Sequence, residues 1–321
     1  MKIIVIGLGS MGKRRIRLIR EMYPDYSIIG IDGRTDRKEE VNKQFNIVCI
    51  DSIDNVETAD CAFICTPPLS HNSLIHECLQ RGWNVFTELN LVQDGYHENM
   101  ALAREVNRTL FLSSTFFYRE EIRYIREKVI SDKKWNYIYH IGQYLPDWHP
   151  WESYKDFFLG DKRTNGCREI MAIELPWITG TFGEVTSVNV LSDKLTSLNI
   201  DYNDNFIIQL QHKNGSKGTL VVDVVSPIAV RKLEIYGEGA YLAWNGTPDS
   251  VAEFDADKKK LVAVKLSEQT EHIDGYSALV VENAYKNEIR EFFNVITEMN
   301  PAQYGFEQDL DVLKLIDIIG A

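Results

Sequence analysis

A glycine-rich turn directly behind an apolar run is the feature that most constrains this chain. The run at residues 3–6 reads Ile-Ile-Val-Ile, which is typical of a buried parallel strand, and Gly7, Gly9 and Gly12 follow at once. Beyond the turn, apolar residues recur at helical steps of three and four. A strand, a glycine turn and a helix in this order are the context in which a G-x-G-x-x-G motif holds a dinucleotide. The sequence therefore predicts that the chain begins with a Rossmann strand–turn–helix unit.

Each glycine of the motif has its own expected task. Gly7 allows the tight turn, Gly9 lets a pyrophosphate approach the backbone, and Gly12 lets the helix pack closely against the strand. The phosphates then lie against free amide groups at the start of the helix, so Ser10 and Met11 belong to the predicted cofactor site.

An acidic residue follows the second predicted strand. Residues 27–31 end at Asp32, about twenty residues past the third glycine, where a Rossmann fold places a carboxylate on the adenosine ribose hydroxyls. Asp32 therefore favours NAD. Arg34 leaves NADP open, because an arginine at this place can receive a 2′-phosphate.

Length and charge limit the number of domains and the kind of partner. A chain of 321 residues suggests two domains, and a net charge of −12 argues against non-specific nucleic-acid binding. We interpret the basic cluster of the first helix as a solvated face rather than a binding patch. The cluster consists of Lys13, Arg14, Arg15, Arg17 and Arg20.

The apolar stretches and the cysteines indicate in which compartment the protein resides and whether it binds a metal. No apolar stretch approaches the roughly 18 residues that cross a bilayer, and the start on a core strand leaves no room for a signal peptide. The five cysteines lie mostly in apolar patterns, so we expect buried thiols in a cytoplasmic protein. No Cys/His cluster has ligand spacing, so no metal is expected.

The pattern of apolar residues along the chain changes after about Tyr118. Up to that point strands and helices alternate, which predicts parallel strands with right-handed crossovers. Beyond it, long segments alternate with period two, which predicts antiparallel strands with one face covered. The predicted fold class is α/β, with a Rossmann doubly wound parallel sheet in a dinucleotide-binding domain at 1–118. An α+β domain with a large open, mostly antiparallel sheet follows at 119–321, for substrate binding and oligomerisation.

The second sheet has more apolar faces than its few helices can cover. An exposed face of that kind usually marks an interface, so we expect a homodimer or homotetramer.

The whole chain resembles the Gfo/Idh/MocA family of NAD(P)-dependent sugar oxidoreductases. The motifs that carry this resemblance are GLGSMGKR, CTPPLSHNSLIHECLQRGWNVFTE, FFYRE at 116–120 and NEIREFF at 287–293. The segment GQYLPDWHPWESYKDFF at 142–158 is similar to a branch associated with bacterial surface-sugar and sialic-acid-like biosynthesis.

The resemblance implies a substrate cleft between the two domains. It implies that Glu88 is the glutamate of a Glu-Lys-Pro motif and that Arg119 opens the inter-domain region. For His71, capping of a helix and a cofactor role stay open. The residues implied at the cofactor ribose and nicotinamide are Thr66, Pro67, Pro68 and His71 together with Glu88, and those implied at the substrate are Arg119, Asp147, Trp151, Arg168 and Glu169.

The chain departs from the family pattern at two motifs. Leu89 and Asn90 stand where the family has lysine and proline, and Ile170 and Glu174 stand where it has aspartate and histidine. Hydride transfer from a sugar carbinol needs a base for the hydroxyl proton, so another group must supply it.

Two ionisable residues are the predicted replacements. His149, in a loop rich in proline and tryptophan, has an unperturbed pKa near neutrality; the same loop could equally be a packed surface loop. Burial could raise the pKa of Glu174, or Glu174 could be a structural partner of Arg168 or Arg119.

Two functions of different classes remain open on the sequence. The first is an NAD(P)-dependent oxidoreductase acting on a sugar, a sugar acid or a nucleotide-linked sugar. The alternative is a non-catalytic dinucleotide-binding sensor or partner protein, which the missing lysine and histidine would support.

Overall fold

The computed structural model describes residues 1–129, 133–148, 153–266, 279–298 and 300–321. They form two compact units. The first unit comprises residues 1–114 and 285–310, and the second comprises 115–284 and 311–321.

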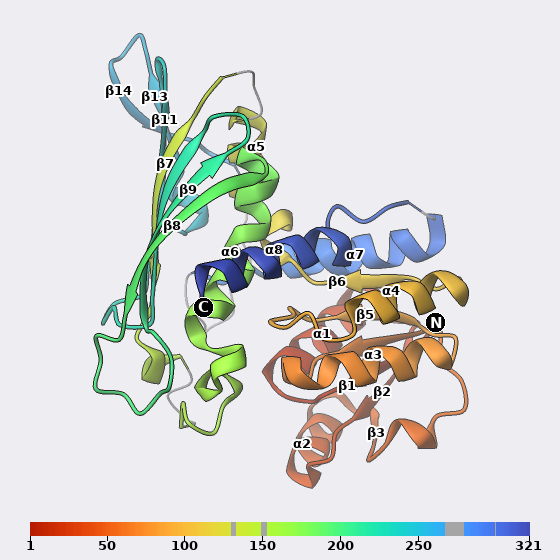
Figure 1. The fold of residues 1–321 in the computed structure, drawn as a ribbon. Helices are drawn as coiled ribbons and strands as arrows, with labels where there is room; N and C mark the ends of the chain where they lie inside the picture. The colour runs from red at the N-terminus through yellow and green to blue at the C-terminus, as the bar shows by residue number, and fades with distance from the viewer. Residues whose placement is uncertain (130–132, 149–152, 267–278, 299) are drawn as a thin grey trace. The chain divides into compact units, whose positions relative to one another are not determined.

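A six-stranded parallel sheet forms the core of the first unit (Figure 1). Its order, β3-β2-β1-β4-β5-β6, is that of a doubly wound Rossmann sheet. The central strand is an uninterrupted apolar run, with Ile3, Ile4 and Val5 fully buried, as a strand covered on both faces requires. The strands are β1 (Lys2–Ile6), β2 (Ser27–Ile31), β3 (Val48–Ile50), β4 (Cys61–Ile64), β5 (Asn84–Thr87) and β6 (Leu110–Leu112).

Five helices accompany this sheet in the sequence or pack on it. They are α1 (Ser10–Met22), α2 (Thr35–Phe45), α3 (His71–Gln80), α4 (Tyr96–Glu105) and α7 (Glu282–Glu298). The α7 side chain Phe292 packs edge-on against Phe63 and Phe86, with ring centroids 5.2 and 5.4 Å apart. Residues 285–310 therefore return to the first unit, whereas the sequence analysis had assigned everything after residue 118 to the second domain. Helix α8 (Phe306–Ile319) begins in the first unit and ends in the second.

An eight-stranded mixed sheet dominates the second unit, in the order β14-β13-β12-β11-β7-β10-β9-β8. Neighbouring strands are antiparallel except for the parallel pair of β7 and β10. The strands are β7 (Asn136–Gly142), β8 (Val185–Asp193), β9 (Asn205–His212), β10 (Lys217–Asp223), β11 (Val230–Gly237), β12 (Ala240–Trp244), β13 (Ala252–Asp255) and β14 (Lys260–Ala263).

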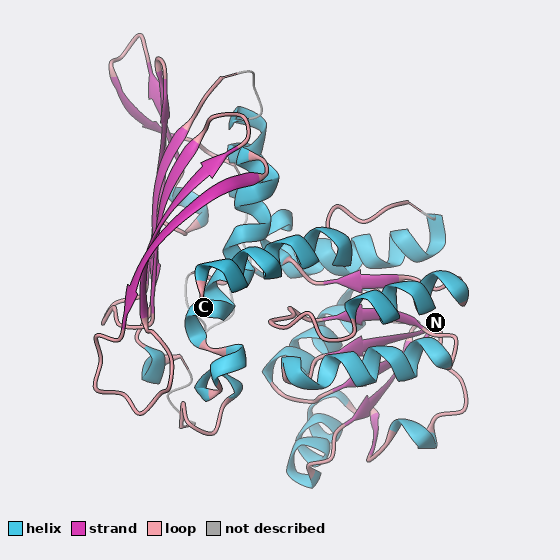
Figure 2. Ribbon diagram, viewed as in Figure 1, coloured by secondary structure: helices cyan, strands magenta, loops and turns pink. Residues whose placement is uncertain are grey.

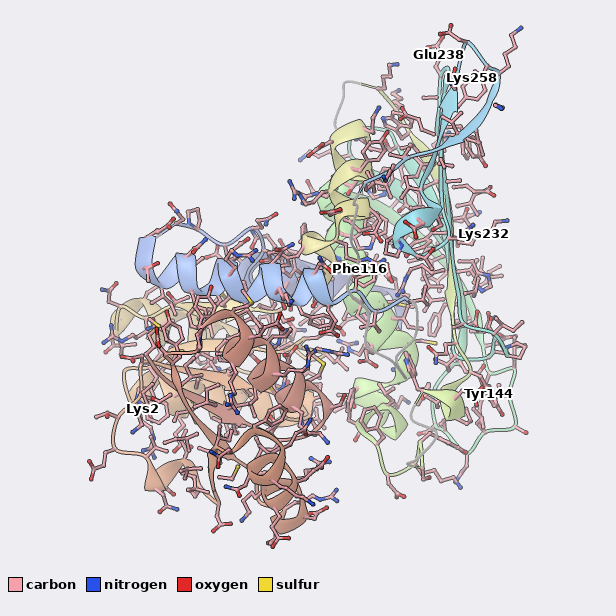
Figure 3. All side chains as sticks on the ribbon, turned by 180° about the vertical axis from the view of Figure 1, so that it is seen from behind. Lys2, Phe116, Tyr144, Lys232, Glu238 and Lys258 are labelled. Carbon is pink, nitrogen blue, oxygen red and sulfur yellow. The ribbon has the colours of Figure 1, made fainter. Side chains whose placement is uncertain are left out.

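The two faces of this sheet differ. Helix α6 (Gly166–Phe182) packs on one face, where Phe182 stacks on Tyr137 at 4.3 Å, and α5 (Glu120–Val129) lies beside α6 (Figure 2). On the other face Ile138 is 46% exposed and Ile207 is 41% exposed. Lys232, which is paired in register with His140, also lies on this side, away from α5 and α6 (Figure 3). We call it the open face.

The structure confirms the predicted fold class: a parallel Rossmann sheet and a mostly antiparallel second sheet. Glycine also fills positions of positive φ at two ends of elements. Gly82 has φ +74° just past α3, and Gly215 has φ +88° in the turn between the antiparallel strands β9 and β10.

Candidate functional site

The glycine turn after β1 is shaped by close contacts that only glycine tolerates. Gly7 has φ +92°, and a Cβ atom there would lie 2.7 Å from the carbonyl oxygen of Cys65. A Cβ atom at Gly12 would lie 1.9 Å from the carbonyl oxygen of Gly7. At Gly9, by contrast, a Cβ atom would meet only the flexible side chain of Arg37, at 3.6 Å. The first and third glycines are thus required by packing, and the second leaves its backbone open to approach.

The N-terminus of α1 presents backbone amides without a side-chain cap. Gly9 is the N-cap residue, and no side chain accepts a hydrogen bond at this end. The first intrahelical bond runs from the Lys13 amide to the Gly9 carbonyl at 3.0 Å, so the amides of Ser10, Met11 and Gly12 have no partner within the helix. Such an end attracts an anion, because amide groups and the helix dipole both favour negative charge.

Asp32 stands at the end of β2, next to this turn. Its Oδ2 accepts a hydrogen bond from the Leu8 amide at 2.8 Å, and its Oδ1 accepts one from the Arg34 amide at 2.9 Å. Each carboxylate oxygen has two lone pairs, so both retain capacity for a ligand hydroxyl. The Arg34 guanidinium turns to Asp36. Arg37 lies beside Asp32, although the sequence did not mark Arg37 as a site residue. Its position two residues into α2, shortly after Asp32, is the sequence feature that could have indicated it.

The segment after β4 is fixed by a buried histidine. His71 is 2% exposed, with Nε2 2.7 Å from the Thr66 carbonyl oxygen and Nδ1 2.6 Å from Oδ1 of Asn90. Burial lowers the pKa of His71, and its contacts with Asn90 and the Thr66 carbonyl oppose that shift. His71 does not cap α3; it joins the loops that follow β4 and β5. In the loop between Thr66 and His71, Pro67 is exposed and Pro68 is buried.

Glu88, directly after β5, is held by Arg15 of α1. Arg15 donates from Nε to Oε1 of Glu88 at 2.6 Å and from Nη2 to Oε2 at 3.2 Å. Nη2 also donates to Glu288 at 2.6 Å. Arg15 is fully buried, whereas the Glu88 side chain is 13% exposed. Burial alone would lower the pKa of Arg15, but the carboxylates of Glu88 and Glu288 raise it. Glu88 therefore presents a fixed, partly exposed anion.

This pair corrects the interpretation of the basic cluster on the first helix. Arg15 is 0% exposed and Arg14 is 7% exposed, so the expectation of a solvated face is wrong for both. The Arg14 guanidinium lies over the ring of Tyr285, 4.6 Å from its centroid. The Glu288 carboxylate and the Tyr285 ring, both on α7, lie against the buried Arg15 guanidinium and offset part of the cost of burying its charge.

In the second unit, Glu174 of α6 is fully buried in an ion pair. Its oxygens accept hydrogen bonds from Arg231 Nε and Nη2 at 3.0 and 2.7 Å, from Tyr139 Oη at 2.8 Å and from Trp177 Nε1 at 2.7 Å. The sequence had offered Arg168 or Arg119 as its partner, and both alternatives are wrong. The carboxylate is saturated by protein donors.

The two arginines expected at the substrate have other partners. Arg168 donates to Asp317 Oδ1 and to the Ala321 carbonyl, both at 2.7 Å. Arg119 is 3% exposed and pairs with Glu121, and it also donates to the Gly246 carbonyl at 2.8 Å.

Glu169 differs from every charged residue above. It is half-buried in the first turn of α6, and no hydrogen bond or ion pair of its carboxyl group is found among the described residues. Burial raises the pKa of Glu169 to about 7. Asp147 is exposed in a short 3₁₀ turn. His149 and Trp151 lie outside the described residues.

Comparison with known proteins supports what the first unit shows. Residues 1–112 match the model of an oxidoreductase family with an NAD-binding Rossmann fold. The matched region is thus similar to the Gfo/Idh/MocA oxidoreductases over about a third of the chain. Members of the family are NAD(P)-dependent oxidoreductases and bind NAD or NADP.

One curated relative matches part of this chain. Biliverdin reductase A of Homo sapiens is 24% identical over 133 residues, which cover 40% of this chain and 45% of the human protein. The match therefore spans less than half of that relative.

Solved structures share the fold of almost the whole chain. UDP-N-acetylglucosamine 3-dehydrogenase GnnA from Acidithiobacillus ferrooxidans superposes with a TM-score of 0.77 at 16% identity, covering 99% of this chain and 96% of GnnA. The WlbA dehydrogenase from Chromobacterium violaceum, solved with NADH and UDP-GlcNAcA, has a TM-score of 0.78 at 12% identity, covering 100% and 92%. Within the described residues, no helix is both long and apolar enough to cross a membrane.

Proposed function

We propose that this chain is an NAD(P)-dependent oxidoreductase that exchanges a hydride with a carbon of a sugar, a sugar acid or a nucleotide-linked sugar. The observation that carries the proposal is the uncapped N-terminus of α1 behind the Gly7 turn, with the carboxylate of Asp32 beside it. Two further facts support it: the family match over residues 1–112, and a fold shared with a nucleotide-sugar dehydrogenase.

The residues of the first unit fit a dinucleotide. The amides of Ser10, Met11 and Gly12 would bind the pyrophosphate, which passes over Gly9, where a side chain would otherwise stand. Asp32 would accept hydrogen bonds from the ribose hydroxyls, which favours NAD, while Arg34 is turned away toward Asp36. When bound, the dinucleotide supplies the hydride chemistry at its nicotinamide ring.

The carboxyl ends of β4 and β5 would face the nicotinamide end, since ligands of open α/β sheets bind at this edge. Thr66, Pro67 and Pro68 follow β4, and Glu88 follows β5. Arg15 holds the Glu88 carboxylate in one orientation. His71 connects the loop after β4 to the loop after β5 through its contacts with Thr66 and Asn90. These contacts would orient the nicotinamide ring of the bound dinucleotide.

The second unit would supply the substrate contacts and the proton carrier. Arg119, Asp147, Trp151, Arg168 and Glu169 are the proposed substrate residues. We keep His149 as the proposed base that takes the hydroxyl proton. Glu174 is withdrawn from that role, because its four hydrogen bonds leave no free site for a proton from a substrate.

A non-catalytic dinucleotide-binding protein is the second candidate function. Leu89 and Asn90 in place of lysine and proline favour it, and so does a Glu174 that is bound entirely by protein groups.

For either function we propose a homodimer or homotetramer formed through the open face. We also propose that the protein resides in the cytoplasm, which keeps the five free cysteines reduced.

A two-part experiment separates these candidates. Calorimetry measures the binding of NADH and NADPH, and the absorbance of reduced nicotinamide measures turnover of a panel of sugars, sugar acids and nucleotide sugars. The enzyme proposal expects both binding and turnover of at least one class, with His149→Ala lowering turnover by about 10²–10⁴-fold at unchanged NADH affinity. Binding without any turnover identifies the non-catalytic candidate. No binding of either dinucleotide contradicts both.

A further inference from the structure

Within the first unit, four buried polar side chains connect the loop after β4 to the start of α8. They are His71, Asn90, Tyr96 and Asp309, and we call them the polar row. Asp309 is fully buried, and the other three are each 2% exposed. Neither Tyr96 nor Asp309 has a role in the proposed dinucleotide site, so their burial needs an explanation of its own.

The ring of His71 lies between two oxygens that can only accept hydrogen bonds. Nε2 is 2.7 Å from the Thr66 carbonyl oxygen, so Nε2 carries a proton. Nδ1 is 2.6 Å from Oδ1 of Asn90, and this contact requires a proton on Nδ1 as well. The ring is then an imidazolium. A neutral ring requires instead that the Asn90 amide turn over and that its Nδ2 donate to Nδ1. The Thr87 hydroxyl, 3.2 Å from Nδ1, can donate or accept and fits both cases.

The other end of the Asn90 amide is close to Tyr96. When Oδ1 of Asn90 contacts His71, the Nδ2 group is buried and has no hydrogen-bond partner among the described residues. The Tyr96 hydroxyl still interacts with this amide: burial and the Asp309 carboxylate raise the pKa of Tyr96, and Asn90 acts against them. An unpaired buried amide group is unfavourable, so the orientation of Asn90 depends on the direction in which Tyr96 donates.

Asp309 determines the direction in which Tyr96 donates. Oδ2 of Asp309 accepts a hydrogen bond from the Tyr96 hydroxyl at 2.5 Å, and Oδ1 accepts one from the Tyr304 hydroxyl at 2.7 Å. Burial raises the pKa of Asp309 to about 6, and the two hydroxyl groups oppose that shift. An ionised Asp309 can only accept from Tyr96. A protonated Asp309 can donate to the Tyr96 oxygen, and the Tyr96 hydroxyl can then donate to Asn90.

We propose that His71 and Asp309 share one proton, and that the Asn90 amide turns over when this proton changes place. With the proton on His71, the ring donates to Oδ1 of Asn90. The Nδ2 group then faces the Tyr96 oxygen, and Tyr96 donates to the Asp309 carboxylate. With the proton on Asp309, the carboxyl group donates to Tyr96, and Tyr96 donates to Oδ1 of Asn90. Nδ2 then donates to Nδ1 of a neutral His71.

Both of these arrangements pair the buried groups of the polar row, and a third arrangement does not. With a neutral His71 and an ionised Asp309, Tyr96 must donate to Asp309. The Asn90 oxygen then faces another acceptor, either Nδ1 of His71 or the Tyr96 oxygen. Two buried acceptors that face each other are unfavourable, so the pair holds its last proton more tightly than either group would alone.

The shared proton adds or removes a positive charge next to Glu88. Burial lowers the pKa of His71, and Glu88 is the charged group that opposes this shift. Asp94, which lines a small cavity together with His71 and Tyr96, is exposed. In both arrangements Nε2 of His71 donates to the Thr66 carbonyl. The loop after β4 is therefore held in the same way while the charge beside it changes.

Nitrogen NMR of the full chain with isotope-labelled histidine tests the connection between His71 and Asp309. The chain has seven histidines, and His71→Gln identifies the signals of His71. Asp309→Asn removes the carboxylate but keeps a donor for Tyr96. At pH 8 it should lower the ratio of protonated to neutral His71 by about tenfold or more. Asp311→Asn is the matched control, because it removes a carboxylate of α8 that is 82% exposed, and it should leave the ratio unchanged.

Tyr96→Phe distinguishes the hydrogen-bonded connection from a long-range effect of charge. It keeps the Asp309 carboxylate but removes the hydroxyl group between Asp309 and Asn90. By itself it should lower the His71 ratio to within about twofold of the Asp309→Asn value, and adding Asp309→Asn should change the ratio by less than about twofold. Thermal unfolding checks that each variant is folded, and Tyr96→Phe alone decides the question if Asp309→Asn does not fold.

Two results would overturn the proposal. One is an Asp309→Asn variant with the His71 ratio of the parent. The other is a Tyr96→Phe variant that keeps the parent's ratio while Asp309→Asn lowers it, which would indicate that only the charge of Asp309 acts on His71. The measurement needs neither a dinucleotide nor a substrate, so its outcome is independent of the proposed function.

Discussion

Charged and polar groups have different surroundings in two regions of the molecule. One is the edge of the first sheet at the carboxyl ends of its strands, and the other is helix α6 of the second unit. At the edge, the amides of Ser10–Gly12 and one side of Glu88 are left with capacity for a ligand. On α6, Glu174 and Arg168 are bound by protein groups, and only Glu169 is not. The first region keeps polar groups open to a ligand, whereas most of the charge on the second is paired within the protein.

The ion pair of Glu174 gives the largest expected effect in this comparison. Glu174→Gln leaves Arg231 buried beside a neutral group, so the free energy of unfolding should fall by about 3–5 kcal/mol in urea or thermal denaturation. Glu184→Gln is the control, because its pair with Lys213 is exposed and should matter little. A Glu174→Gln variant as stable as the parent, with turnover lowered about 10²–10⁴-fold, would instead restore Glu174 as a catalytic group.

Glu169 gives a smaller effect that depends on pH. Its pKa of about 7 in the folded state lies above its ordinary value of 4.5, so the folded chain binds the extra proton between these values. Stability should therefore fall as pH rises from about 4.5 to 7, and Glu169→Gln should remove that slope and stabilise the chain at pH 8 by about 1–3 kcal/mol.

Melting temperatures across this pH range measure the effect of Glu169. Glu120→Gln, which removes an exposed carboxylate at the start of α5, is the control and should leave the slope in place. If the slope persists unchanged in Glu169→Gln, the carboxyl group of Glu169 is solvated, and α6 holds no group poised near neutral pH.

The open face of the second sheet gives the smallest effect on the folded chain itself. Ile207→Lys should leave the melting temperature of the subunit nearly unchanged but dissociate the proposed assembly, because it places a charge at an exposed apolar position of the open face. Analytical ultracentrifugation of the parent should give a multiple of 37.0 kDa. Ile318→Lys, an equally apolar exposed site on α8, should not change the mass. A parent mass near 37.0 kDa contradicts the interface.

The sequence predicts those parts of the molecule that depend on local geometry. Gly7 must have a positive φ and Gly12 must lie against the Gly7 carbonyl, and both needs show in the motif spacing alone. Residues of the second sheet alternate between a covered and an open face, as the period-two pattern indicates: Tyr139 is buried and Ile138 is exposed. The fold class follows from such patterns.

The charged residues were less predictable, because their partners come from distant parts of the chain. Glu174 pairs with Arg231 on another element, and Arg15 pairs with Glu288, which is 273 residues away. A helical pattern shows which residues share a face, but it does not show what packs on that face. Arg15 was therefore expected to be solvated.

The central claim is that the first unit binds a nicotinamide dinucleotide over Gly9. Calorimetry of Gly9→Val with NADH and NADPH tests it most directly. The variant should fold, since a Cβ atom there meets only the Arg37 side chain, and Gly33→Ala, with nothing within 4 Å, is the matched control. We expect Gly9→Val to lower the affinity for both dinucleotides by about 100-fold or more, because the pyrophosphate can no longer reach the amides, while Gly33→Ala binds like the parent. A folded Gly9→Val that keeps the parent's affinity would contradict the account.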